Sequence, residues 1–181
     1  MDTEVKEAFV KSEHGNKQER YEAYQYILEA TEHEVDWAYE VWDELLESLS
    51  HKDNHQRSRA AQYLSNLAGS DPDKRMIADF DKLWLVTRDE KFVTARHSLQ
   101  SVWKVGMAGP EQREMVMRYM SDRFIDCTEE KNYTLIRSDI IQNMRHLYDR
   151  LEDEQIKNTA FDLIEQVEEP AYKKKYSAIW K

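Results

Sequence analysis

Apolar side chains recur along this chain at the spacing of one face of an α-helix. In residues 35–49, for example, Val41, Trp42, Leu45 and Leu49 share one helical face. Short polar stretches separate such segments. The pattern predicts helices over residues 17–31, 35–49, 54–68, 72–87, 91–105, 110–126, 128–149, 152–168 and 170–180, and residues 2–12 fit a further short helix.

Several predicted helices begin with residues that satisfy free backbone N–H groups. Asn16 and Asp53 each precede a helix and can accept hydrogen bonds from its first turn. Asp71 is followed by Pro72, which suits the first helical position. The sequence predicts an all-α fold of about nine helices in a single domain over residues 1–181. The connections between these helices are short, so neighbouring helices should run antiparallel.

An arginine recurs at near-even spacing within this helical pattern. Four arginines, Arg20, Arg57, Arg96 and Arg137, are separated by 37, 39 and 41 residues. Small or apolar residues lie three and seven positions after each arginine: Ala23 and Ile27, Ala60 and Leu64, Leu99 and Trp103, Ile140 and Met144. A period near 40 residues with helical spacing inside it is typical of stacked helix pairs.

The local sequence around these arginines resembles a HEAT repeat, which has a leucine-rich first helix, an acidic loop residue, and an arginine followed by alanines and a spaced leucine. Residues 45–68 carry this pattern in Asp53, Arg57, Ala60, Ala61 and Leu64, and residues 81–105 carry it in Asp89, Arg96, Leu99 and Trp103. Residues 119–147 follow it through Arg137, Ile140 and Met144. The chain therefore resembles the HEAT/armadillo α-solenoids over roughly 150 residues.

This resemblance implies a right-handed α-α superhelix with residues 1–16 and 152–181 as atypical capping segments. It also implies that the arginine near the start of each second helix pairs with a loop carboxylate. We therefore expect partners for Arg57 and Arg96 among Asp53, Asp89 and Glu90.

Composition supports a helical, acidic protein. The chain has only 4 glycines and 3 prolines, too few for the turns of a sheet protein, and its net charge is −10. Residues 1–69 hold 15 acidic and 7 basic side chains, a balance that would repel nucleic acid there. A single cysteine, no secretion signal and no long apolar run predict a cytoplasmic protein with no membrane segment, and we expect a monomer.

No set of residues typical of catalysis or metal binding stands out. The sequence lacks a glycine-rich phosphate loop, a nucleophile elbow and a zinc-type Cys/His set. His51 and His55 flank a loop without a third ligand, and the lone Cys127 lies beside acids that would raise its pKa. We therefore expect no metal, no cofactor and no catalytic residue.

The second helix of each pair carries a candidate partner face. In HEAT-like arrays these helices line the concave surface, and positions five and six after each arginine fall off the core stripe. The predicted partner-binding residues on this face are Gln25, Tyr26, Arg59, Gln62, Tyr63, Asn66, Ser101, Gln142, Asn143 and His146. Amides and tyrosines suit recognition of a protein or peptide.

These observations favour a non-catalytic scaffold or adaptor that binds a protein or peptide partner. The alternative is a HEAT-like DNA glycosylase or related repair protein, in which Trp103, Asp139 and Arg96 would serve the site. Chromophore-handling HEAT-like lyases are a third possibility. The acidic balance disfavours nucleic acid as the partner.

Overall fold

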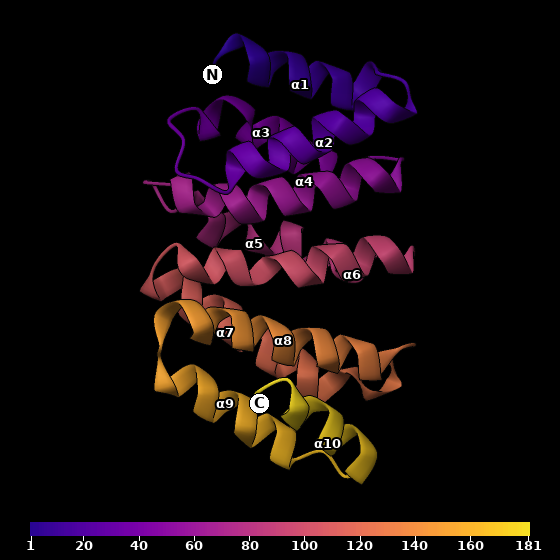
Figure 1. Ribbon diagram of the computed structural model, residues 1–181, viewed down its shortest axis with the longest axis vertical. Helices are drawn as coiled ribbons and strands as arrows, with labels where there is room; N and C mark the ends of the chain where they lie inside the picture. Colours follow the sequence, from indigo (N-terminus) through magenta and orange to yellow (C-terminus); the bar gives the residue numbers. More distant parts are fainter. The chain divides into compact units, whose positions relative to one another are not determined.

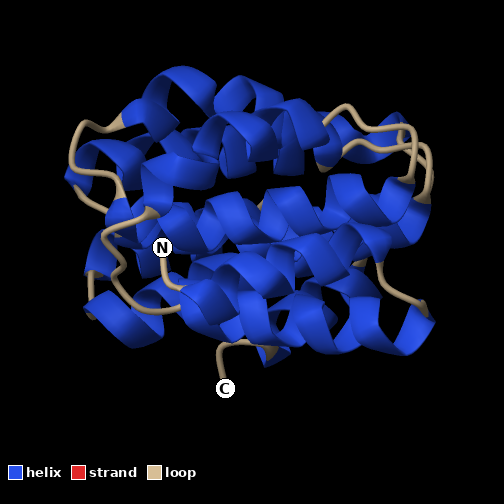
Figure 2. Ribbon diagram, turned by 90° about the horizontal axis from the view of Figure 1, so that it is seen from above, coloured by secondary structure: helices blue, strands red, loops and turns tan.

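The computed structural model describes all 181 residues and contains helices joined by turns and loops, with no strand (Figure 2). Ten α-helices and three 3₁₀ helices follow one another along the chain. The α-helices are α1 (Thr3–His14), α2 (Lys17–Thr31), α3 (Ala38–Ser48), α4 (Asn54–Leu67), α5 (Arg75–Val86), α6 (Phe92–Ser101), α7 (Pro110–Asp126), α8 (Tyr133–Leu151), α9 (Glu154–Glu165) and α10 (Pro170–Ala178). The 3₁₀ helices are η1 (Ala68–Ser70), η2 (Val102–Met107) and η3 (Cys127–Glu129). The all-α prediction is confirmed.

Two compact units divide the chain, one over Met1–Ser101 and the other over Val102–Lys181. In the first unit, consecutive helices form the pairs α1–α2, α3–α4 and α5–α6. The second helices of these pairs also contact one another, α2 with α4 and α4 with α6, and they lie side by side in Figure 1. The first unit therefore stacks three helix pairs with their second helices on a common side.

The second unit is built around α8. This helix contacts α7, η2, η3, α9 and α10, and α9 and α10 also contact each other. Phe124 of α7 and Tyr176 of α10 meet edge to face, with ring centroids 6.0 Å apart. The Tyr176 hydroxyl donates to the Thr134 carbonyl at 3.0 Å, which fixes the last helix against the start of α8.

The predicted capping residues explain where α2 and α4 begin. The Asn16 side chain accepts from the backbone N–H groups of Gln18 and Glu19, and Glu19 reaches back to the Asn16 N–H in a capping box. The Asp53 side chain accepts from the His55 N–H at 2.9 Å. Both N-cap predictions are confirmed.

Two predicted boundaries in the first unit are wrong, for identifiable reasons. Helix α5 begins at Arg75 and not at Pro72, because the Asp71 carboxylate accepts from the N–H groups of Arg75 and Met76 and Lys74 adopts a left-handed backbone with φ 55°. Helix α6 ends at Ser101, and the chain continues as the 3₁₀ helix η2. Trp103 therefore lies outside the α-helix that the repeat pattern assigned to it.

In the second unit, the predicted helix start at 128 is also wrong. Residues Cys127–Glu129 form the 3₁₀ helix η3, and α8 begins at Tyr133 after Asn132 has turned the backbone into the left-handed region with φ 63°. Polar Glu130 and Lys131 separate the two helices. No helix in the structure is both long and apolar enough to cross a bilayer.

The repeated apolar positions lie in the core of each unit. Seven of the eight residues three and seven places after the repeat arginines are buried, including Ile27, Leu64 and Met144, which are fully enclosed. Trp103 is half-buried, because it sits in η2. The helix faces that the arginine spacing predicts to be buried are therefore the faces that form the core.

The predicted pairing of Arg57 with a loop carboxylate is confirmed. Its guanidinium binds Asp89 through two hydrogen bonds, from Nε to Oδ2 at 2.6 Å and from Nη2 to Oδ1 at 3.0 Å. Nη1 also donates to the carbonyls of His51 and Lys52. Arg57 thus joins the loop after α3 to the loop after α5 and holds two helix pairs together.

The arginine of the second unit has different partners. Nε of Arg137 donates to the Phe124 carbonyl at 2.8 Å, and its guanidinium lies over the rings of Phe124 and Tyr133. Arg57 and Arg137 therefore each hold segments of their own unit together, although the contacts that they make differ.

Candidate functional site

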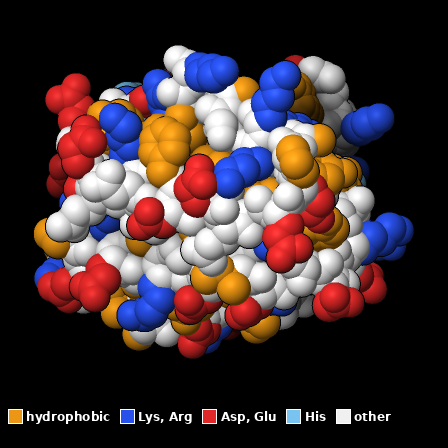
Figure 3. All heavy atoms as spheres, turned by 90° about the horizontal axis from the view of Figure 1, so that it is seen from below, with side chains coloured by type: hydrophobic (Ala, Val, Ile, Leu, Met, Phe, Trp, Pro, Cys, Tyr) orange, Lys and Arg blue, Asp and Glu red, His pale blue; other side chains and the backbone are white.

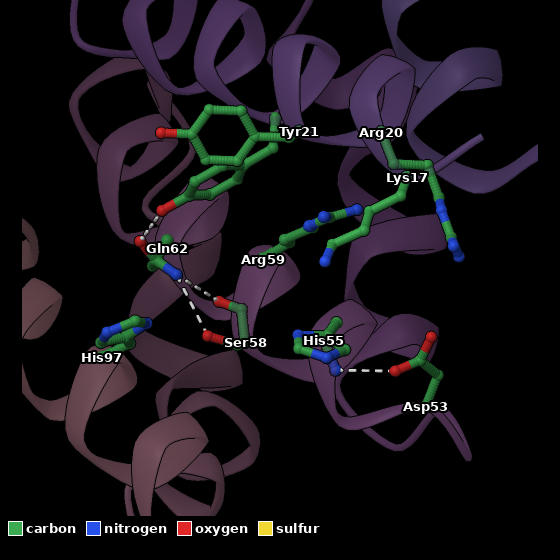
Figure 4. A pocket seen from close by; sticks show the side chains of 10 residues that line it. Lys17, Arg20, Tyr21, Asp53, His55, Ser58, Arg59, Gln62 and His97 are labelled. Atoms are coloured by element: carbon green, nitrogen blue, oxygen red, sulfur yellow. Dashed lines mark hydrogen bonds between the residues drawn. The ribbon is translucent and has the colours of Figure 1, made fainter. Parts of the chain in front are cut away.

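A cavity of the first unit opens on the common side of α2, α4 and α6. Its volume is about 460 Å³, which lies within the usual range for ligand pockets. Side chains of all three second helices, together with the N-cap of α4, line it: Lys17, Arg20, Tyr21, Tyr24, Asp53, His55, Ser58, Arg59, Gln62 and His97. We call this cavity the α2–α4–α6 groove (Figure 4).

A hydrogen-bonded chain of side chains forms part of the groove lining. The Tyr24 hydroxyl donates to Gln62 Oε1 at 2.8 Å, and Gln62 Nε2 donates to the carbonyl and the hydroxyl of Ser58 at 3.2 and 3.1 Å. Burial raises the pKa of Tyr24, so its hydroxyl stays protonated and remains a donor at neutral pH. These bonds fix the orientation of the Gln62 amide and tie α2 to α4.

Arg59 is held at the groove by contacts of its guanidinium group. The guanidinium lies over the Tyr24 ring, 5.4 Å from its centroid, and Nη1 donates to the Ser12 carbonyl at 3.2 Å. The side chain is half-buried and has no carboxylate partner. Its positive charge is therefore positioned by the fold and remains uncompensated.

Two further cations extend from the first turns of α2 toward the same space. Figure 4 shows Lys17 pointing toward Arg59, with Arg20 beside it and His55 across the opening. The side chains of Lys17 and Arg20 form no ion pair or hydrogen bond within the chain. Elsewhere arginines do pair with carboxylates: Arg57 with Asp89, Arg75 with Asp43, Arg123 with Glu130 and Arg145 with Asp149.

The electrostatic character of the groove thus differs from that of the chain as a whole. Asp53 is the one acidic residue in the lining, and its carboxylate already accepts a hydrogen bond from the α4 backbone. The N-terminal turns of α2 and α4, where helix dipoles are positive, adjoin the same cations. On the face shown in Figure 3, by contrast, acidic and basic side chains are intermixed.

Of the residues predicted to bind a partner, Arg59 and Gln62 lie in the groove. Arg20 and Asp53, predicted as structural residues of the repeat, line it as well. Gln25 is exposed on α2 outside the lining. Tyr26 turns away toward α1, where its hydroxyl donates to Glu4 at 3.4 Å.

Three other predicted residues of the first unit are interior and cannot form an exposed ladder. Tyr63 is 2% exposed and packs between the rings of Phe9 and Tyr24. Asn66 is 9% exposed, and its Nδ2 donates to Leu28 O and Thr31 Oγ1 at the end of α2. Ser101 is buried and donates to the Ser98 carbonyl.

The predicted residues of the second unit divide in the same way. Asn143 is 1% exposed and belongs to the core. Gln142 and His146 are half-buried on α8, and the imidazole of His146 stacks against Trp103 with centroids 5.1 Å apart. Burial lowers the pKa of His146, which favours a neutral ring at this contact.

The prediction missed six residues of the groove lining, and a sequence signal for three of them exists. Tyr21, Ser58 and His97 each directly follow a repeat arginine. This position lies one helical turn before the position five residues after the arginine, so it shares that face. Lys17, Tyr24 and His55 lie three or four residues from Tyr21 or Ser58 and so share their helical face, but their offsets from the repeat arginines are not common to the repeats.

Two of the side chains weighed above for catalysis, Cys127 and Asp139, are buried. No group of three His, Cys, Asp or Glu side chains converges as metal ligands would. Cys127 is fully buried, and burial raises the pKa of its thiol. Asp139, considered for the glycosylase alternative, is 6% exposed and belongs to the interior of the second unit.

Comparisons with protein families, with curated proteins and with solved structures found no match for this chain.

Proposed function

We propose that this chain is a HEAT-like, non-catalytic binding module that holds an extended segment of a partner protein in the α2–α4–α6 groove. The observation that carries the proposal is the groove itself, which has a volume of about 460 Å³ and is lined by three adjacent second helices. Stacked helix pairs present such surfaces without a catalytic pocket.

The chemistry of the lining supports a peptide ligand. Tyr21 is 56% exposed at the rim and offers both apolar area and a hydroxyl. Below it, the network of Tyr24, Gln62 and Ser58 holds polar groups in fixed directions. Rigid aromatic and amide groups bind peptides at low conformational cost.

Selection from a displayed library of random linear peptides tests this proposal. The purified full chain should enrich a shared motif, and Tyr21→Ala should weaken binding of the enriched peptides. Leu85→Ala is the matched control, because Leu85 is 68% exposed on α5 outside the groove. Enrichment without a motif, or equal effects of the two variants, would count against the groove as the binding site.

Nucleic acid remains the alternative ligand, because Lys17, Arg20 and Arg59 form an unpaired basic cluster. A duplex would also approach acidic surface, since residues 1–69 hold 15 acidic against 7 basic side chains. We therefore expect no tight complex with duplex DNA in a mobility-shift assay at low salt. Tight binding that weakens steeply as salt rises would favour the alternative.

A further inference from the structure

Three cations line a cavity whose lining holds a single carboxylate, that of Asp53, and this excess of positive charge requires explanation in a chain of net charge −10. Lys17, Arg20 and Arg59 repel one another, and each could have been placed beside one of the many surface carboxylates. We propose that the groove binds a phosphate group carried by the partner segment, and this inference rests on the proposed function.

The number and arrangement of the donors favour phosphate over a carboxylate. A phosphorylated side chain brings a charge of about −1.5 to −2 and three acceptor oxygens, whereas a carboxylate brings one charge and two oxygens. Two guanidinium groups and one ammonium supply matching charge from α2 and α4. Arginine forks also bind phosphate through paired hydrogen bonds.

The way in which Arg59 is held adds a structural reason. Its contacts with the Tyr24 ring and the Ser12 carbonyl fix the guanidinium before any ligand arrives. Lys17 and Arg20 are less constrained and can close on an anion from the other side. A preorganised cation flanked by adaptable ones lowers the ordering cost of binding.

The positive charge is confined to one end of the groove, which favours a phosphorylated protein segment over a polyanion. The cations lie at the N-terminal halves of α2 and α4, whereas the lining side chain from α6 is His97. A nucleic acid would need positive charge along its whole path. A single phosphate with a flanking peptide needs positive charge at one end and polar or aromatic contacts beyond it, which Tyr21, Gln62 and His97 offer.

Two fluorescent peptide pools test the inference with the full-length chain. One pool holds a fixed phosphoserine between degenerate positions, and its twin holds serine. We expect the phosphoserine pool to bind about tenfold more tightly or better, as hydrogen bonds to a charged group would produce. Inorganic phosphate at millimolar concentration should compete with it.

Variants locate the site. Lys17→Gln and Arg20→Gln remove partly or fully exposed side chains that have no partner in the fold, so both proteins should fold normally. Each should reduce the preference for the phosphoserine pool by about fivefold or more. Lys6→Gln is the control, because Lys6 is an exposed lysine on α1 outside the groove.

The outcomes separate this inference from the proposed function. Equal binding of both pools, or equal binding of a pool with glutamate in place of phosphoserine, overturns the phosphate inference and leaves a peptide groove. Failure of every peptide pool, including the unmodified library, overturns the proposed function too. If a single-stranded oligonucleotide bound more tightly, and this binding depended on Lys17 and Arg20, the ligand of the groove would be nucleic acid and not a phosphopeptide.

Discussion

Replacing Asp89 by asparagine should destabilise the first unit strongly, because it breaks an ion pair that joins two helix pairs. The Arg57 and Asp89 side chains are only 15% and 6% exposed, and two hydrogen bonds connect them. Asn keeps the size of the side chain and removes its charge. The change therefore tests the charge of the pair with little disturbance of packing.

The expected magnitude follows from burial. Breaking a fully buried ion pair costs about 3–5 kcal/mol, whereas an exposed pair contributes about 0–1 kcal/mol. Because Arg57 keeps some exposure and retains its bonds to the His51 and Lys52 carbonyls, we expect a loss of about 2–4 kcal/mol. For a chain of this size, such a loss lowers the melting temperature by about 5–15 °C.

Urea unfolding followed by circular dichroism measures this loss, with Asp43→Asn as the matched control. Asp43 also binds an arginine, Arg75, but its side chain is 78% exposed. We expect the control to change stability by no more than about 0.5 kcal/mol. If the two variants lose the same small amount, the Arg57–Asp89 pair does not hold the helix pairs together.

The pH dependence gives a second check. Burial alone would raise the pKa of Asp89, but hydrogen bonds from Arg57 and the Lys91 N–H outweigh it and leave the pKa below its usual value. The stabilisation is therefore complete above the unfolded pKa of roughly 3.9 and is lost as pH falls through the lower folded value. The difference between wild type and Asp89→Asn should be constant above about pH 5 and shrink in stronger acid.

Three further substitutions probe the core and the second unit. Ala60→Glu puts a charge at a position that is 2% exposed, so we expect several kcal/mol of destabilisation and loss of helical signal by circular dichroism; a near-normal melt would contradict the assigned core face. Asn66→Ala removes the bonds to Leu28 O and Thr31 Oγ1 and should cost about 1–3 kcal/mol in urea unfolding. His146→Gln should reduce the loss of stability between pH 7 and 5, because burial lowers the folded pKa of His146 and protonation then favours the unfolded chain.

Helical periodicity predicted the fold because burial dominates the placement of apolar side chains. Ala60 and Leu64, three and seven residues after Arg57, are both in the core, and the same offsets after Arg20 are buried as well. Boundaries were less predictable, since they depend on individual hydrogen bonds. Asp71 could cap the amides of residues 73 and 74 or those of Arg75 and Met76, and only the folded backbone distinguishes these options.

The candidate site was partly predictable. Arg59 and Gln62 follow from helical phase, because both lie off the core stripe of α4. The burial of Tyr63 and Asn66 does not follow from helical phase, because the exposure of side chains beside the core stripe depends on which other helices pack against them. Tyr63 is covered by Phe9 from α1, and Asn66 reaches the carbonyl end of α2. Neither contact can be read from the local sequence.

Helix geometry explains why polarity repeats along the groove while positive charge does not. The residue after each repeat arginine lies about 200° from the core position two residues later, which is consistent with Tyr21, Ser58 and His97 lining the groove. Lys17 and Arg59 occupy offsets that hold other residue types around Arg96. The shared offset therefore accounts for Tyr21, Ser58 and His97 in the groove, whereas the positive end of the groove depends on side chains particular to α2 and α4. A ligand selected by charge must accordingly bind at that end, and removing Lys17 should change ligand preference without changing the fold.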